Sequence, residues 1–271
     1  MYIVSAVIQN NKSRVALYDK DYKLLLKKDG ASADTAKLCI DAINETKIKA
    51  SDVAYIGVAV DRDPITVATD IEKSTGIKCY GSSIISARAL GEAYLANDVL
   101  DLCLLKIDET IECGIVIDKK MYAGEGQLGG KVAHMIINFG GYECSCGGKG
   151  CFEAYANNAG LRRIAAESGV ADSDSLTHAS LFAMTTPEAE AAKKLYVEYL
   201  ASGITNIINL FQPNELVLEG DFAEAGDALM TPMMDIILRE QYTHGMPLKC
   251  NIRFANKEAD VALIGAALLG R

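Results

Sequence analysis

Four soft metal ligands lie close together in the middle of this 271-residue chain. His134, Cys144, Cys146 and Cys151 follow one another with the spacing His-x9-Cys-x-Cys-x4-Cys. One imidazole and three thiolates form a complete tetrahedral set for zinc, and four protein ligands leave no open position for water. A single reduced cysteine more often packs as a small apolar residue, but three cysteines and a histidine in one loop favour a metal. The sequence therefore predicts a structural zinc site.

Glycines surround these ligands and can form the tight turns that a metal knuckle requires. They are Gly140, Gly141, Gly147, Gly148 and Gly150, and glycine reaches positive φ without a steric penalty. Structural zinc contributes on the order of 10 kcal/mol to the ordering of small sites. We therefore expect residues 134–153 to form a loop whose conformation the metal holds.

The metal-ligand pattern resembles the zinc loop of the ROK family, which comprises bacterial sugar kinases and sugar-responsive repressors. The resemblance lies in His134 and in the runs 144–147 (Cys-Ser-Cys-Gly) and 150–153 (Gly-Cys-Phe-Glu). It implies that His134 contacts a sugar as well as zinc, and that Glu153 contacts a sugar hydroxyl. The resemblance extends more weakly along nearly the whole chain.

Composition and charge narrow the class of protein. Half of the residues are apolar, glycine is plentiful and tryptophan is absent, which is typical of an α/β protein with a sizeable buried core. The net charge of -9 repels phosphate backbones and anionic lipids. The chain enters a strand-like apolar run at Tyr2 without a charged leader, and no apolar run is long enough to cross a membrane. We expect a cytoplasmic protein with reduced cysteines.

The elements that must position these residues form two successive series. Three β-rich runs separated by polar turns predict an antiparallel meander at 2–8, 14–18 and 23–27. Periodicity then predicts helices at 33–46, 64–75 and 84–96 and strands at 53–60 and 78–80. The second series has strands at 102–107, 114–118, 215–218 and 251–254 and helices at 158–168, 175–183, 188–211, 226–242 and 261–269.

Three antiparallel strands followed by alternating helices and strands are the order of an actin-like, or ribonuclease-H-like, lobe. We therefore expect an α/β protein of two such lobes, with residues 1–107 in the N-terminal lobe and 108–257 in the C-terminal lobe. The zinc loop, 134–153, is an insertion in the second lobe. The resemblance implies that a closing helix, about 258–271, packs back on the first lobe.

The segments that the resemblance assigns to ATP depart from the pattern of ROK kinases. Phosphoryl transfer requires glycine-rich turns near the phosphates and Mg²⁺. The first turn maps onto residues 7–11, where the acid and the glycines are missing and Asn10 and Asn11 replace them; asparagine tolerates positive φ. The second maps onto 108–114, with Thr110 as the candidate contact and three carboxylates that would repel phosphates unless a metal intervened. We favour a solvated acidic turn there. Gly220 keeps one glycine of the pair that the family uses for adenosine.

The resemblance also implies a catalytic Asp at the start of the helix that contains Ala-Leu-Gly-Glu, and Ile84 occupies that position. Asp61 and Asp63 are candidates for a displaced base, although an acidic helix cap beside Pro64 explains them better. A base is typically worth 10²–10⁴-fold in rate.

Four residues remain candidates for a sugar ligand. They are Ser83, Lys131, His134 and Glu153. Lys131 stands where the family has a glutamate, so a hydroxyl acceptor has become a donor. The alternatives are that Lys131 faces solvent and that Glu153 caps the helix that follows.

These features predict a ROK-like protein with degenerate catalytic and phosphate motifs, which serves as a non-catalytic or weakly active sensor or regulator of a carbohydrate-type ligand. The alternative is an active sugar kinase that uses ATP and Mg²⁺, of the glucokinase or N-acetylhexosamine kinase type. The DNA-binding repressor branch requires a winged-helix segment ahead of the first strand, which begins at Tyr2, so we expect no direct DNA binding. By analogy with the family, a homodimer is an open alternative to a monomer.

Overall fold

The chain opens with the antiparallel meander that its first apolar runs predict. The computed structural model describes residues 1–97, 99–240, 242, 249–257 and 260–271. Strands β1 (Tyr2–Gln9), β2 (Lys12–Asp19) and β3 (Leu24–Ala31) pair in sequence order. β3 is longer than the predicted range of 23–27, because its backbone pairs with β2 as far as Ala31. This ladder of hydrogen bonds overrides the turn-forming residues near its end.

The turn between β1 and β2 has the conformation that its two asparagines favour. Asn10 and Asn11 have φ angles of 52° and 60°, and Gln9 pairs directly with Lys12 across the turn. A two-residue hairpin loop with positive φ at both positions matches the right-handed twist of the strands. The two asparagines therefore have a structural role that requires no ligand.

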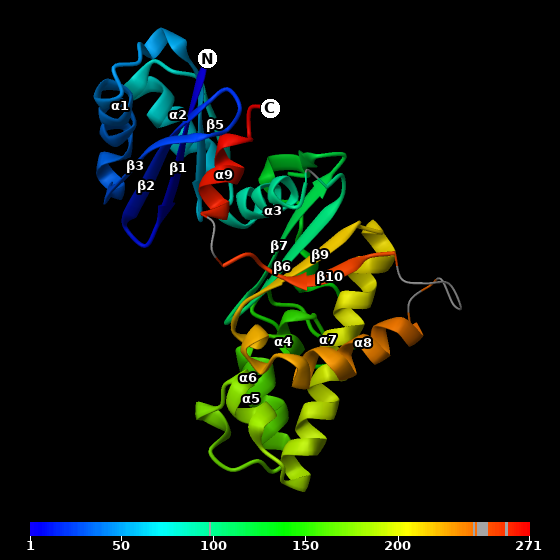
Figure 1. Ribbon diagram of the computed structural model, residues 1–271. Helices are drawn as coiled ribbons and strands as arrows, with labels where there is room; N and C mark the ends of the chain where they lie inside the picture. Colours follow the sequence, from blue (N-terminus) through cyan, green and yellow to red (C-terminus); the bar gives the residue numbers. More distant parts are fainter. Residues whose placement is uncertain (98, 241, 243–248, 258–259) are drawn as a thin grey trace. The chain divides into compact units, whose positions relative to one another are not determined.

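Two parallel strands complete the first sheet, and helices cover both of its faces (Figure 1). β4 (Val53–Val60) pairs with β1 and β5 (Cys79–Ser82) pairs with β4, which gives the order β3-β2-β1-β4-β5. Side chains alternate along β1. Val4 and Ala6 share a core with α1 (Thr35–Glu45) and α2 (Pro64–Thr75), whereas Ile3 and Val7 share a core with α3 (Ile84–Leu95) and α9 (Val261–Ala267).

Helices α3 and α9 approach each other at backbone distance. A Cβ on Gly265 would lie 1.6 Å from the carbonyl oxygen of Ala87, and one on Gly91 would lie 2.2 Å from that of Val261. Any larger residue at either position would push the helices apart. The small residues of the closing helix are therefore required for packing within this part of the chain.

The second sheet has the order β10-β9-β6-β7-β8. Its strands are β6 (Leu102–Ile107), β7 (Ile111–Ile117), β8 (Lys120–Met121), β9 (Glu215–Glu219) and β10 (Asn251–Phe254). β9 runs parallel to both β6 and β10. The remaining helices are α4 (Glu153–Ala156), α5 (Asn158–Glu167), α6 (His178–Ala183), α7 (Pro187–Phe211) and α8 (Asp227–Glu240). Single 3-10 turns occur at Ser32–Asp34, Ala50–Asp52, Glu125–Gln127, Val132–His134, Ser173–Ser175 and Asp221–Ala225.

Most predicted elements of this half occur, and the differences lie at their ends. α6 begins at His178 rather than at residue 175, because Thr177 and Ser180 form a reciprocal capping box that fixes the start of the helix. The described part of α8 extends to Glu240. Part of the helix predicted at 226–242 and part of the closing segment 258–271 fall on residues 241 and 258–259, which lie outside the described residues.

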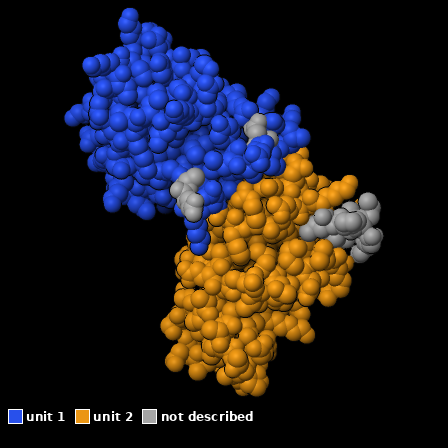
Figure 2. Space-filling model, viewed as in Figure 1, with its two compact units in different colours: residues 1–100, 114–129, 256–271 blue, residues 101–113, 130–255 orange. Residues whose placement is uncertain are grey.

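The described chain forms two compact units, which Figure 2 colours separately. One contains residues 1–100, 114–129 and 256–271, and the other contains residues 101–113 and 130–255. The lobe boundaries at 107–108 and 257–258 remain a prediction, because a compact unit need not be an independently folding domain. Within the described ranges, no helix is both long and apolar enough to cross a lipid bilayer.

Candidate metal centre and acidic turn

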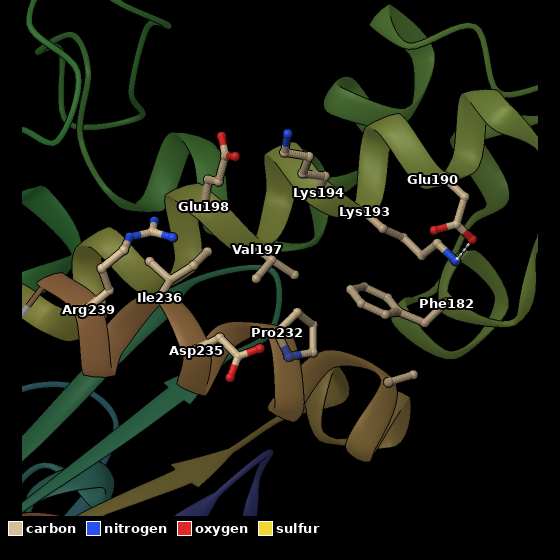
Figure 3. Close-up of a pocket in the computed structure, with 11 residues that line it drawn as sticks. Phe182, Glu190, Lys193, Lys194, Val197, Glu198, Pro232, Asp235, Ile236 and Arg239 are labelled. Carbon is tan, nitrogen blue, oxygen red and sulfur yellow. Dashed lines mark hydrogen bonds and ion pairs between the residues drawn. The ribbon is translucent and has the colours of Figure 1, made fainter. Parts of the chain in front are cut away.

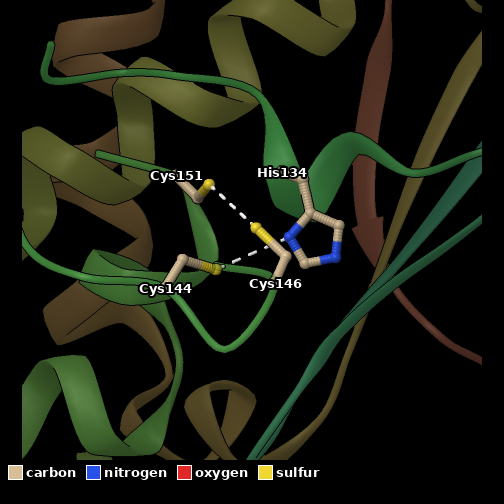
Figure 4. Close-up of side chains that lie close together, drawn as sticks. All are labelled: His134, Cys144, Cys146 and Cys151. Atoms are coloured by element: carbon tan, nitrogen blue, oxygen red, sulfur yellow. Dashed lines mark hydrogen bonds between the residues drawn. The ribbon is translucent and has the colours of Figure 1, made fainter. Parts of the chain in front are cut away.

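The four predicted metal ligands converge in the second unit (Figure 4). Their ligand atoms all lie within 4.8 Å of one another. The Cys146 and Cys151 sulfurs are 3.7 Å apart, and the Cys144 sulfur lies 3.6 Å from His134 Nδ1. Tetrahedral zinc, with bonds of about 2.3 Å to sulfur and 2.0–2.1 Å to nitrogen, would separate these pairs by about 3.8 Å and 3.6 Å. The donor set and its spacing therefore fit zinc.

The polypeptide around the ligands is a tight knuckle that depends on glycine. The backbone N–H of Gly147 donates to the carbonyl of Cys144 at 3.0 Å, and the N–H of Cys144 donates to Gly148 at 2.9 Å. Gly147 and Gly150 have φ angles of 87° and 78°. A Cβ on Gly150 would also lie 1.9 Å from the carbonyl oxygen of Asn138. These contacts account for the glycines that the sequence places beside the cysteines.

Aromatic residues fasten the loop to the rest of its unit. The hydroxyl of Tyr155, which is fully buried, accepts the backbone N–H of Tyr142 at 2.9 Å and the side-chain amide of Asn138 at 3.0 Å. Phe152 is also fully buried and packs on α7, where a Cβ on Gly203 would lie 2.2 Å from its ring. The base of the loop is therefore anchored by packing, and the ligand-bearing tip is the part that a metal would order.

The thiol environments differ across the cluster. Burial, together with the Cys144 and Cys146 thiols, raises the pKa of Cys151 to about 12. The backbone N–H of Gly148 and the Cys144 thiol lower the pKa of the exposed Cys146. A divalent cation between the sulfurs would favour the thiolate form of all three. All eight cysteines are free thiols in the structure.

Glu153 joins the metal loop to the turn between β6 and β7. It begins α4, two residues after Cys151, and its side chain is 7% exposed. One carboxylate oxygen accepts the Ser145 hydroxyl at 3.0 Å, and the other accepts the backbone N–H of Ile111 at 3.0 Å. A carboxylate has about four acceptor positions, so Glu153 keeps capacity for another donor.

We call residues 108–112 the acidic turn. The segment after Glu153 holds this turn through hydrogen bonds to the backbone carbonyls of the turn. The N–H of Asn158 donates to the carbonyl of Asp108 at 2.9 Å, and the side-chain amide of Asn157 donates to the carbonyl of Glu109 at 2.8 Å. Thr110, the predicted nucleotide contact, is exposed at the tip of the turn, and its carbonyl accepts the N–H of Asp108 at 3.1 Å.

Carboxylates from two segments meet beside the acidic turn. The side-chain amide of Asn158 donates to Glu109 at 3.2 Å and to Asp221 at 2.9 Å. The backbone N–H of Asp221 in turn donates to the Asp108 carboxylate at 2.9 Å. Gly220 permits this contact, since its φ is 122° and a Cβ would lie 2.0 Å from the carbonyl oxygen of Ile107. The structure therefore brings the predicted residues Thr110, Gly220 and Glu153 into one neighbourhood.

Cations partly balance the charge of this neighbourhood. Lys106 lies 2.9 Å from the Asp108 carboxylate, and Arg162 lies 3.5 Å from that of Glu109. Both pairs are partly exposed, so each contributes at most about 1 kcal/mol to stability. Burial raises the free energy of the Lys106 ammonium, but its hydrogen bond with Asp108 and the nearby acids outweigh that effect and raise its pKa. The turn remains rich in negative charge.

The predicted site residues of the first unit have local structural roles. Ser83 caps α3 by accepting the backbone N–H of Ser86 at 3.3 Å, and Ile84 is buried at the start of that helix. Asp63 caps α2 by accepting the N–H of Thr66 at 3.4 Å, as the cap interpretation predicts. Asp61 is exposed just before it. Lys131 is exposed in the second unit, and its carbonyl accepts the N–H of His134 at 3.1 Å.

Sequence reasoning missed three residues of the metal centre and acidic turn. Ser145, Asn158 and Asp221 make the contacts described above, yet each is a common polar residue in a polar segment. The placement of Ser145 between two ligands was the one available signal, because two metal bonds restrict the side chain between them. Asn158 and Asp221 carry no comparable signal, since their contacts span 49 and 113 residues of sequence.

A separate cavity of about 350 Å³ lies in the second unit, lined mainly by α7 and α8 (Figure 3). Lys193 and Glu190 form an ion pair at one end, 2.5 Å apart. The lining mixes acids and bases with apolar side chains such as Val197 and Pro232. None of the site residues predicted from the sequence lines this cavity.

Comparison with known proteins agrees with the arrangement of the helices and strands. The model of the ROK family matches residues 43–271. The xylose repressor of Bacillus subtilis is 26% identical over 184 residues, which cover 67% of this chain and 45% of the repressor. The glucokinase of Thermotoga maritima is 24% identical over 266 residues, which cover 83% of each protein. The chain spans about half the length of the xylose repressors that it matches.

Solved structures show the same fold. The ROK hexokinase from Thermus thermophilus superposes with a TM-score of 0.81 at 23% identity, over 99% of this chain and 97% of the hexokinase. A ROK family transcriptional regulator, a homologue of the E. coli MLC protein, superposes with a TM-score of 0.74 at 19% identity, over 99% of this chain and 77% of the regulator. The prediction of an α/β, two-sheet, actin-like fold is therefore confirmed.

Proposed function

Because this chain belongs to the ROK family, we propose that it binds a carbohydrate-type ligand beside a zinc-ordered loop and acts as a sensor or regulator with little or no kinase activity. His134, Cys144, Cys146 and Cys151 hold the zinc in this proposal. The metal has a structural role, since four protein ligands leave no position for a substrate. The metal keeps the loop tip in place, and this also holds the side chains of His134 and Glu153 in position.

The ligand contacts proposed for the sugar within the second unit are Lys131, His134 and Glu153, and Ser83 stays a candidate from the sequence. Glu153 supports this assignment because its carboxylate is fixed by two donors and retains acceptor capacity for a hydroxyl. Lys131 contributes a donor just before that loop. A ligand that carries its own carboxylate or phosphate would suit this cation, which distinguishes the proposed ligand class from plain hexoses.

The observation that carries the low-activity part of the proposal is the convergence of Glu109 and Asp221 on the Asn158 amide. Asp108 adds a third carboxylate through the N–H of Asp221. The resemblance assigns this acidic turn and Gly220 to the nucleotide, and negative charge of this density repels a triphosphate. With Ile84 at the position of the base, these features support degenerate catalytic and phosphate motifs.

The second candidate function is an ATP- and Mg²⁺-dependent sugar kinase. It is favoured by the Thermotoga maritima glucokinase, which matches over 83% of both proteins. The sequence candidates for that function are Asn10, Asn11, Thr110 and Gly220 for the nucleotide and Asp61 or Asp63 for the base. The xylose repressors, which match over about half of their length, support the sensor instead. Direct DNA contact by this chain is no part of the proposal, because its net charge is -9.

A coupled phosphotransfer assay separates the two functions. The zinc-loaded protein is tested with Mg-ATP against hexoses, N-acetylhexosamines and glycerol-like acceptors, with the Thermotoga maritima enzyme on glucose as the positive control. The proposal predicts turnover well below the range of about 1–100 per second that kinases reach. Turnover within that range on any acceptor, lost in the Asp61→Asn or Asp63→Asn variant, would establish the kinase.

A further inference from the structure

We propose that Glu153 is a positioning residue that makes the start of β7, at Ile111, respond to metal at the cluster of His134, Cys144, Cys146 and Cys151. The inference rests on the zinc site proposed above and adds a means by which its occupancy would change the acidic turn. Two hydrogen bonds on opposite oxygens of one buried carboxylate carry the response.

The loop side of this link lies between two metal ligands. Ser145 separates Cys144 from Cys146, so bonds from both sulfurs to a metal would fix its backbone. Its hydroxyl then donates to Glu153 Oε1 at 3.0 Å. Without a metal, the three sulfurs either repel one another as thiolates or take up protons. In both cases the exposed tip that carries Cys146 and Ser145 loses its restraint.

The turn side of the link is buried. Ile111 is 5% exposed and Glu153 is 7% exposed, and the Ile111 N–H donates to Glu153 Oε2 at 3.0 Å. A buried carboxylate that loses one donor is left poorly solvated, so its side chain moves to find another. When the Ser145 hydroxyl leaves, Glu153 shifts toward solvent, and the Ile111 N–H loses its acceptor.

The same turn provides an internal reference that should not respond. The N–H of Asn158 donates to the carbonyl of Asp108, and this bond begins at α5 rather than at the metal loop. The packing of Phe152 on Gly203 also anchors the intervening chain without the metal. Metal removal should therefore free the amide of Ile111 and leave that of Asn158 protected.

Residue-resolved amide hydrogen exchange tests the inference. Metal content is measured first, and exchange is then compared between the zinc-loaded protein and the same protein treated with a chelator. We expect protection of the Ile111 amide to fall about tenfold on zinc removal, the size of one lost hydrogen bond. Protection of the Asn158 amide should change less than about twofold.

Three variants assign the effect to the Ser145–Glu153 contact. Ser145→Ala keeps all four ligands, so it should still bind one zinc, but protection of Ile111 should no longer depend on the metal. Ser145→Thr restores the hydroxyl and should restore the dependence. Glu143→Ala is the matched control, because Glu143 is an exposed loop residue that pairs with Lys149 at 3.3 Å. It should respond to zinc as the unmodified protein does.

The outcomes distinguish this inference from the zinc site itself. If the unmodified protein binds no zinc, both proposals fail. If it binds zinc and the protection of Ile111 is unchanged by removal, or if Ser145→Ala still responds, the zinc site stands and the role of Glu153 is overturned.

Discussion

The Glu153 carboxylate accepts the backbone N–H of Ile111 at 3.0 Å, although 42 residues of sequence separate them. This contact places Glu153, two residues after the last metal ligand, directly against the acidic turn. Glu153 therefore belongs to two structures at once, the metal loop through Ser145 and the second sheet through Ile111. A ligand that contacts Glu153 will meet a carboxylate that is already oriented.

Glu153→Gln should keep the zinc and weaken ligand binding. Glutamine can accept the Ile111 N–H with its one oxygen and donate its amide N–H to the Ser145 hydroxyl, but it loses the negative charge and the second acceptor oxygen that a sugar hydroxyl would use. Hydrogen bonds to a charged group contribute about 1.5–3 kcal/mol, so we expect a 10- to 100-fold loss of affinity for any sugar that binds. Calorimetry on protein of verified zinc content measures the change. Unaltered affinity would remove Glu153 from the ligand site.

Cys146→Ser should abolish zinc binding and lower the midpoint of thermal unfolding. The anchors at Tyr155 and Phe152 limit the effect to the loop tip, so we expect a loss of a few kcal/mol rather than the larger values of isolated zinc peptides. In a chain of this size, about 2–4 °C corresponds to each kcal/mol. Cys79→Ser is the control, because Cys79 lies outside the loop. The serine hydroxyl can replace the Cys79 thiol as the hydrogen-bond donor to the carbonyl of Ile77. A full zinc content in Cys146→Ser would contradict the ligand assignment.

His178 should make the folded protein less stable in mild acid. It is 1% exposed, and burial lowers its pKa from 6.5 to about 4, although Asp221 and Asp108 oppose the shift. The Tyr196 hydroxyl donates to the carbonyl of Ala156 at 2.7 Å, so His178 Nε2 is the donor in its 2.7 Å contact with Tyr196. Between pH 6.5 and 4 the unfolded state binds a proton on this histidine that the folded state does not. The free energy of unfolding therefore decreases by up to about 3 kcal/mol as the pH is lowered through this range.

His178→Gln provides the comparison for that pH dependence. Its side-chain amide can still donate to Tyr196, but it does not titrate. Chemical unfolding at pH 7.5 and at pH 4.5 should show a smaller loss of stability for the variant than for the unmodified protein. Equal losses would show that protonation of His178 is not linked to folding.

Gly203→Ala should destabilise the protein even though alanine favours helices. Alanine gains about 1 kcal/mol over glycine in a helix interior, but its Cβ would lie 2.2 Å from the Phe152 ring. Overpacking a core typically costs about 1–3 kcal/mol, and Phe152 is fully buried. We expect a net loss in the free energy of unfolding. Ser202→Ala, on the exposed face of the same helix, should be neutral or stabilising; a stabilised Gly203→Ala would contradict the tight contact.

The sequence predicted the features that depend on local pattern. The periodicity of α7, the meander before β4 and the spacing of the four metal ligands are all visible within a few turns of chain. The end of β3 at Ala31 was not predictable, because pairing with β2 decides it rather than its own residues. The start of α6 depended on a capping box between Thr177 and Ser180 that the wider helical pattern concealed.

The candidate site was predictable only in part, for a related reason. Chemistry-bearing residue types identified the metal ligands, since few other functions require three thiols and an imidazole together. The contacts of Asn158 and of Asp221 depend on how β6, β9 and α5 meet, and nothing in their own neighbourhoods signals it. The role of Gly203 likewise required its partner Phe152 to be located in space.

Calorimetric titration of the zinc-loaded protein tests the central claim most directly. Hexoses, N-acetylhexosamines, their acidic derivatives and Mg-ATP are titrated separately under the same conditions. The account predicts saturable binding of at least one sugar-type ligand and no binding of Mg-ATP at millimolar concentration. Saturable binding of Mg-ATP, with or without a sugar, would contradict it.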